Sequence, residues 1–146
     1  METLNLPLGT LIHRLRVDRT KSNIDHIHAT KRVEYLNDEV VQSMPHIEWE
    51  EVELVFIPLG KDTSIDNFNA LLKEHYLTPD PVALCEWNAK NPTFADKVPH
   101  GTQWNRNCCA IFRRDVWGGE RLVDVRRFDS VWGGRWFACG SRPVKS

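Results

Sequence analysis

Arginine and tryptophan side chains are concentrated in the last third of this 146-residue sequence. The guanidinium group binds phosphate or carboxylate oxygens and stacks on aromatic rings, while tryptophan stacks on bases or fills pockets of protein partners. These residue types favour a binding surface. The predicted binding residues are Arg121, Arg126, Arg127, Trp117, Trp132 and Arg135. The alternative is a sheet whose tryptophans are buried under helices and whose arginines face water.

A second set of residues has the types needed for acid–base chemistry. His100, Glu120 and Asp124 could move protons, and paired carboxylates can also hold Mg²⁺. A small hydrolase that uses these three residues is therefore an alternative function. Ion pairs with the neighbouring arginines are the favoured explanation of the carboxylates, because no nucleotide-binding glycine motif or nucleophile elbow is present. The sequence favours a non-enzymatic protein without a cofactor.

The spacing of the histidine and cysteine residues does not match known metal sites. His26 and His28 would point about 200° apart on a helix, and no zinc-finger or H-E-x-x-H spacing occurs. No metal site is predicted. The cysteines are expected to be buried thiols in a reducing cytosol. They are Cys85, Cys108, Cys109 and Cys139, and the adjacent pair should face opposite sides of a strand.

The predicted elements are mainly helices before His100 and strands after it. An apolar stripe at mostly helical steps predicts a helix over Ile24–Met44. Two further helices are predicted to begin at Thr63 or Ser64 and at Thr78 or Asp80, which are capping residue types. After His100, short apolar runs alternate with turn residues, which predicts an antiparallel meander. Its predicted strands are Thr102–Trp104, Cys108–Arg113, Arg121–Arg127 and Arg135–Cys139.

The predicted fold is a single α+β domain, residues 1–146, in which helices cover one face of the C-terminal antiparallel meander. Residues 1–50 are expected to be an N-terminal helical extension. Residues 52–146 are expected to form the α+β core, and the buried strand Val52–Ile57 can join the sheet. Val116-Trp117-Gly118-Gly119 returns 15 residues later as Val131-Trp132-Gly133-Gly134. The repeat predicts two similar turns, in each of which the tryptophan covers one end of the sheet.

The net charge of −1 is unevenly distributed. Residues 1–99 carry 10 Lys/Arg and 16 Asp/Glu, whereas residues 100–146 carry 9 and 4. The asymmetry marks either a basic binding face or two parts that attract each other within the fold. No apolar run approaches the roughly 18 residues that span a bilayer, and residues 1–6 lack the features of a secretory signal. A cytoplasmic protein without membrane association is expected.

A last pattern consists of Glu120-Arg121-Leu122, Phe128-Asp129, Trp132 and the run Arg135–Arg142. It resembles the end of small uncharacterised bacterial and phage proteins, and the resemblance covers residues 52–142. No activity is implied, so no catalytic residue is carried over. The sequence thus predicts a small interaction protein that binds another macromolecule through an Arg/Trp-rich sheet. A protein partner is the favoured interpretation, and nucleic acid bound by the same face is the alternative.

Overall fold

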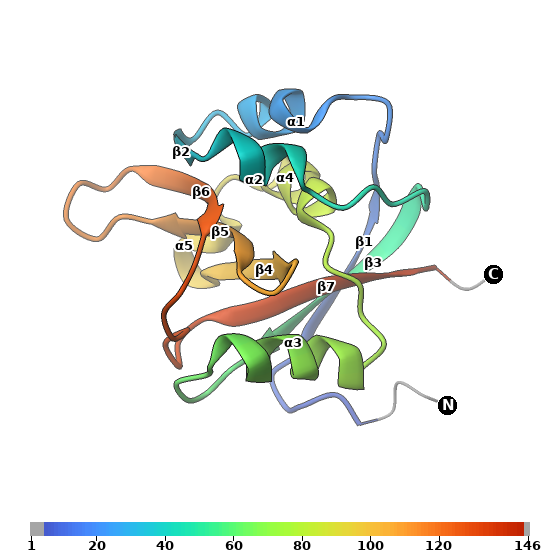
Figure 1. The fold of residues 1–146 in the computed structure, drawn as a ribbon, viewed down its shortest axis with the longest axis vertical. Helices are drawn as coiled ribbons and strands as arrows, with labels where there is room; N and C mark the ends of the chain where they lie inside the picture. The colour runs from blue at the N-terminus through green and yellow to red at the C-terminus, as the bar shows by residue number, and fades with distance from the viewer. Residues whose placement is uncertain (1–4, 145–146) are drawn as a thin grey trace.

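A seven-stranded mixed sheet runs through the part of the chain that the computed structural model describes, residues 5–144 (Figure 1). Its strands are β1 (Leu11–Arg16), β2 (Val33–Leu36), β3 (Glu51–Pro58), β4 (His100–Trp104), β5 (Cys108–Arg114), β6 (Arg121–Arg127) and β7 (Phe137–Pro143). Their order across the sheet is β1-β3-β7-β4-β5-β6-β2. Sequence-distant strands are therefore neighbours, and both edge strands come from the first 50 residues.

Five helices accompany the sheet in the described residues: α1 (Asn23–Ala29), α2 (Asp38–Gln42), α3 (Ile65–Glu74), α4 (Pro81–Lys90) and α5 (Phe94–Lys97). None of them is long and apolar enough to cross a membrane. The expectation that residues 1–6 carry no secretory signal concerns a segment of which residues 1–4 lie outside the described part.

Helices cover both faces of the sheet rather than one. In Figure 1, α1, α2 and α4 lie above the sheet and α3 lies below it. Strand side chains alternate between the two cores, so Phe112 belongs to the core under α1, α2 and α4, and Ile111 belongs to the core under α3. The predicted one-sided arrangement is corrected by this alternation, because central strands that are apolar on both faces need cover on both.

The C-terminal strands form the predicted meander only in part. β4, β5 and β6 are consecutive antiparallel neighbours, but β7 does not continue beside β6. It lies between β3 and β4, antiparallel to the former and parallel to the latter. The α+β class and the joining of β3 to the sheet are confirmed, whereas a purely antiparallel sheet is wrong. Local apolar patterns do not encode which distant strands pair, and this limits the prediction.

The segment predicted as one helix over Ile24–Met44 is α1, then β2, then α2. Lys31 adopts a φ of 57°, which ends the helical path after α1. Asn37 then caps α2 by accepting a backbone N–H with its side chain. Ile27 and Val33 are six positions apart, whereas successive residues of one helical stripe are three or four positions apart. The expected helical extension over residues 1–50 therefore contains the edge strands β1 and β2.

The capping residues correctly predicted where α3 and α4 begin. The Ser64 hydroxyl accepts the N–H of Asn67 at 3.1 Å, and the Asp80 carboxylate accepts the N–H of Ala83 at 3.1 Å. Pro81 occupies the first turn of α4, where a missing N–H leaves no helical hydrogen bond unmade.

The four cysteines are free and buried. Cys108 belongs to the first core and Cys109 to the second, as adjacent strand positions require. Burial raises the pKa of the Cys109 thiol to about 12. A thiol of this kind is protonated and unreactive at neutral pH, so its role is packing.

Asp80 forms an ionic link between three segments of the chain. Asp80 is 1% exposed, and Nη1 and Nη2 of Arg19 each donate a hydrogen bond to one of its carboxylate oxygens at 2.9 Å. The Ser141 hydroxyl of β7 donates to the same carboxylate at 2.7 Å. The loop after β1, the start of α4 and the middle of the sheet therefore meet at one buried charge.

We expect Arg19→Ala to lower the free energy of unfolding by about 3–5 kcal/mol, because it leaves the buried Asp80 carboxylate without its counter-ion. Urea unfolding followed by circular dichroism measures the change. Arg16→Ala is the matched control, since its ion pairs with Glu50 and Glu51 are exposed and worth less than about 1 kcal/mol. Equal losses in the two variants would contradict the assignment.

Candidate functional site

The six predicted binding residues do not share one surface. Alternate residues of β6 point to opposite faces, so Arg121 and Arg127 lie on one side of the sheet and Arg126 on the other. Arg121 and Arg127 also stand at opposite ends of β6, roughly 20 Å apart at about 3.3 Å per residue. Arg135 and Trp132 belong to the segment between β6 and β7. No one flat partner surface can contact all six.

Trp132 lies in the core and does not reach the surface. It is 1% exposed, and its ring stacks on Phe68 of α3 with centroids 4.5 Å apart. Its indole Nε1 donates to Gln103 Oε1 at 2.6 Å, which satisfies a buried amide. Gly101 leaves room for the indole, because a Cβ at that position would lie 2.8 Å from the ring. Trp132 is therefore not accessible to a partner at the surface.

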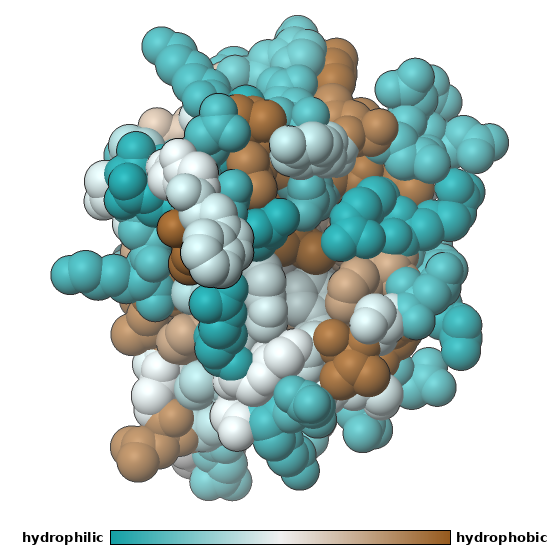
Figure 2. All heavy atoms as spheres, turned by 90° about the vertical axis from the view of Figure 1, so that its left-hand side faces the viewer, coloured by the Kyte–Doolittle hydropathy of each residue, from teal (hydrophilic) through white to brown (hydrophobic). Residues whose placement is uncertain are grey.

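Trp117, in the other Val-Trp-Gly-Gly copy, has the opposite environment. Its residue is 94% exposed and the preceding Val116 is 75% exposed. Both lie at the tip of the β5–β6 hairpin, which projects from the body of the molecule (Figure 1). Seen from the hairpin side, hydrophobic patches are scattered among hydrophilic side chains (Figure 2). The repeat thus places one tryptophan inside the fold and the other in solvent.

The turn that carries Trp117 is held by its own hydrogen bonds. The backbone N–H of Gly119 donates to Asp115 O at 2.8 Å, and that of Asp115 donates to Glu120 O at 2.7 Å. The Asp115 side chain accepts the N–H of Trp117 at 3.0 Å. Gly119 has a φ of 74°, which a glycine adopts without strain. The indole is therefore presented by an ordered turn.

Arginines near the hairpin are partly neutralised by acidic residues of the first 99 positions. Asp96 accepts from Arg121 Nε at 3.0 Å and Nη2 at 2.8 Å, and from Arg114 Nη1 at 3.4 Å. Hydrogen bonding by Arg121 lowers the pKa of Asp96, which keeps this carboxylate charged. At the other end of β6, Arg127 lies 3.5 Å from Glu39.

Arg126 and Arg135 are the exposed arginines of the predicted set that pair with no carboxylate within 4.0 Å among residues 5–144. The Arg126 guanidinium lies 5.6 Å from the ring centroid of Phe128. Arg135 lies 5.8 Å from that of Trp136. Their charges remain available to a partner.

The residues of the hydrolase alternative do not converge. His100 faces the first core, is 0% exposed and stacks on Phe112. Asp124 pairs in register with Ile111 and so lies on the opposite face of the sheet. Glu120 is exposed at the end of the hairpin. In the described part of the chain, no group of three or more His, Cys, Asp or Glu side chains is placed to hold a metal ion.

His100 is held as a neutral ring inside the core. Its Nδ1–H donates to Val98 O at 2.8 Å, and Asn88 Nδ2 donates to its Nε2 at 3.0 Å. A carbonyl can only accept, so the proton resides on Nδ1 and Nε2 is the acceptor. Burial lowers the pKa of His100 to about 3. This histidine packs and accepts a hydrogen bond, and it has no access to substrate.

Comparison of the chain with protein-family models, with curated proteins and with solved structures found no match. The resemblance to bacterial and phage proteins stays a prediction.

The two tryptophans of the repeat should differ in their effect on stability. Trp132→Ala removes a buried ring and should lower the free energy of unfolding by about 3–5 kcal/mol. Trp117→Ala should change it by less than about 0.5 kcal/mol, because the indole touches little protein. Urea unfolding of both variants measures the difference. A large loss in Trp117→Ala would show that the hairpin tip packs against the body.

The buried His100 should make the fold acid-sensitive. Its pKa is about 6.5 in an unfolded chain and about 3 here, so between these values the unfolded state binds a proton that the folded state does not. Stability is therefore full above pH 6.5 and falls as the pH drops, by up to about 1.4 kcal/mol per unit. Unfolding free energies of wild type and His100→Gln at pH 7.5, 6.5, 5.5 and 4.5 test this. The glutamine oxygen can still accept from Asn88, and parallel pH slopes would contradict the prediction.

Proposed function

We propose that this protein is a small cytosolic, non-enzymatic interaction protein that captures a partner protein with the tip of its β5–β6 hairpin. The observation that carries the proposal is the solvent exposure of Trp117 at the tip of a projecting, internally hydrogen-bonded turn. An exposed tryptophan beside an exposed valine costs hydration free energy in the isolated protein, and burial in a partner regains it.

Tryptophan is among the residues that most often dominate the energy of a protein interface. Its ring brings about 150–250 Å² of surface to a contact. The turn is fixed by Asp115 and Gly119, so little conformational freedom is lost when it docks. Val116 adds an apolar neighbour on the same turn. These features support insertion of the hairpin tip into an apolar pocket of the partner.

The charges near the hairpin indicate the chemistry around that pocket. Arg113 and Arg114 end β5, Arg121 begins β6 and Arg126 lies further along the same strand. Arg114 and Arg121 are already paired with Asp96, and Arg113 lies 3.9 Å from Asp124. Arg126 points to the other face of the sheet, so these arginines add little free positive charge to the tip. The partner pocket that fits the tip is therefore chiefly apolar. The proposed binding surface is thereby reduced from an Arg/Trp-rich sheet to Val116 and Trp117 at the hairpin tip.

Site-specific photo-crosslinking tests the proposal. A photoreactive p-benzoylphenylalanine is placed at Val116, and the protein is irradiated in the cells that naturally make it. We expect a covalent adduct with a protein. Adding Trp117→Ala should reduce the adduct by about 30-fold, the effect of removing a residue worth about 2 kcal/mol of binding.

The same photoreactive residue at Tyr76 is the matched control, because Tyr76 is 77% exposed but lies just beyond the end of α3. Adducts of equal yield from both positions, or an adduct that persists with Trp117→Ala, would overturn the proposal. An adduct with RNA or DNA whose yield falls steeply with salt would support the nucleic-acid alternative instead.

A further inference from the structure

Arg32 is a buried arginine that forms no ion pair with any described carboxylate. Its residue is 7% exposed, and it follows Lys31 in the connection between α1 and β2. None of the ion pairs among residues 5–144 includes its guanidinium group. Buried charges in proteins are normally paired, because transfer of an unpaired ion out of water is costly. Asp96 is near enough to favour the charged form of Arg32, but it makes no ion pair with Arg32 and is already hydrogen-bonded to Arg121. The described residues therefore balance the charge of Arg32 only in part.

The groups that do contact Arg32 are neutral, and their contacts are long. Nη1 donates to Arg113 O at 3.3 Å and to Leu122 O at 3.5 Å. Nη2 donates to Pro92 O at 3.1 Å and to Asn88 Oδ1 at 3.3 Å. Charge-assisted hydrogen bonds are usually about 2.7–2.9 Å. The Nε atom is buried and has no hydrogen-bond partner among residues 5–144. The guanidinium is therefore only weakly compensated.

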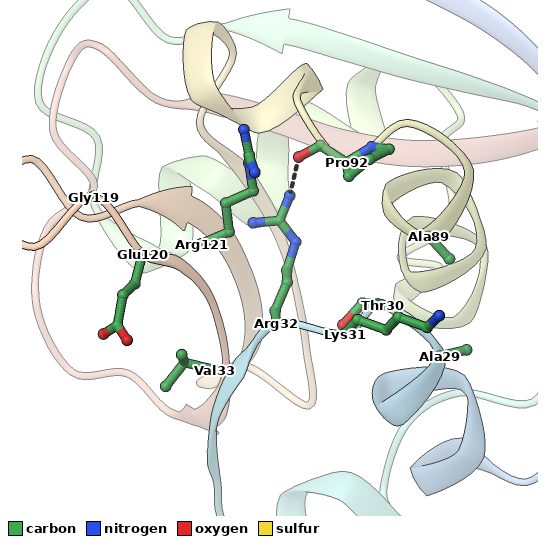
Figure 3. Close-up of a pocket in the computed structure, with 10 residues that line it drawn as sticks. All are labelled: Ala29, Thr30, Lys31, Arg32, Val33, Ala89, Pro92, Gly119, Glu120 and Arg121. Carbon is green, nitrogen blue, oxygen red and sulfur yellow. Dashed lines mark hydrogen bonds between the residues drawn. The ribbon is translucent and has the colours of Figure 1, made fainter.

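A pocket of about 590 Å³ adjoins this arginine (Figure 3). Its lining residues come from the end of α1 and the start of β2, from the end of α4 and from the end of the β5–β6 hairpin. Lys31 and Arg121 line it together with Arg32, and the Arg32 and Arg121 side chains extend side by side in Figure 3. The one acidic lining residue, Glu120, points away from Arg32 in the same view.

The balance of charge at the pocket is positive. Arg121 is fixed by its two hydrogen bonds to Asp96, which therefore offsets one of the three cations. Burial lowers the pKa of Arg32 to about 10, so its guanidinium is still protonated at neutral pH. The remaining walls include the apolar residues Ala29, Val33, Ala89 and Pro92. The volume lies within the range of small-molecule sites, about 300–1,000 Å³.

We propose that this pocket binds a small organic anion through a carboxylate or phosphate group, which supplies the counter-charge that Arg32 lacks. Lys31 and Arg121 make the first contacts, since they are the more exposed cations. The Arg32 side chain then turns its free Nε–H toward the anion and gives up its long contacts to carbonyl oxygens. The apolar walls accept the organic part of the ligand. The proposal does not depend on the hairpin-tip function, because neither Val116 nor Trp117 lines the pocket.

Titration of the purified full-length protein with phenyl phosphate, benzoate and inorganic phosphate tests the proposal, with uncharged benzyl alcohol as the reference compound. We expect phenyl phosphate or benzoate to bind with a Kd on the order of 1 mM or tighter. In ¹⁵N-resolved NMR spectra, the backbone signals of residues 29–33 and 119–121 and the Nε–H signal of Arg32 should shift together. Tighter binding of phenyl phosphate than of benzoate would indicate a phosphate ligand, and the reverse order would indicate a carboxylate ligand.

Arg32→Gln should abolish the binding, whereas Arg135→Gln, which removes an exposed arginine elsewhere, should leave it unchanged. If Arg32→Gln does not fold, the surface double variant Lys31→Gln/Arg121→Gln should still weaken binding by about 10-fold or more, which corresponds to about 1.4 kcal/mol. Absence of shifts with every anion, or equal shifts with benzyl alcohol, would overturn the proposal. Inorganic phosphate that binds as tightly as phenyl phosphate would overturn the assignment to an organic anion.

Discussion

The buried carboxylate of Asp80 is the contact on which the continuity of the sheet depends. It caps α4, pairs with Arg19 from the loop after β1 and accepts the hydroxyl of Ser141 from β7. β7 lies between β3, from the first half of the chain, and β4, from the second. A charge that is satisfied only when these segments meet favours the arrangement in which β7 lies in the interior of the sheet, between β3 and β4. β6 and β2 lie at the far end of the sheet, near the proposed sites.

The sequence predicts what short-range physics decides. Ser64 and Asp80 cap helices because their side chains reach a backbone N–H three residues away. The meander of β4, β5 and β6 follows from short turns between apolar runs. The parallel pairings of β7 with β4 and of β2 with β6 join residues that are far apart in the chain. No local pattern contains that information, so these pairings could not be predicted.

The Val-Trp-Gly-Gly repeat illustrates the same limit at the candidate site. The two copies do not form the similar turns that were expected. The first copy is the hairpin turn, whereas in the second Trp132 pairs with Thr63 in a β-bridge and a turn follows at Gly133–Trp136. Trp132 meets the side chain of Gln103 and the bare backbone of Gly101, whereas Trp117 ends a hairpin that extends beyond the body of the fold. Burial of a tryptophan is decided by what the fold places opposite it. Identical four-residue sequences therefore acquire a structural role in one place and a surface role in the other.

The fold also decides which arginines are paired with carboxylates and which are left unpaired. Much of the positive excess after residue 100 is neutralised across the fold, as Asp96 with Arg121 and Glu53 with Arg142 illustrate. The expectation that the acidic and basic parts attract each other thus accounts for most of the asymmetry. Arg32 lies in the acidic part of the sequence, where composition gives no reason to expect an unbalanced cation, yet it is buried without an acidic partner among the described residues. Because its environment comes from α4, β5 and β6 together, only the three-dimensional arrangement could identify it.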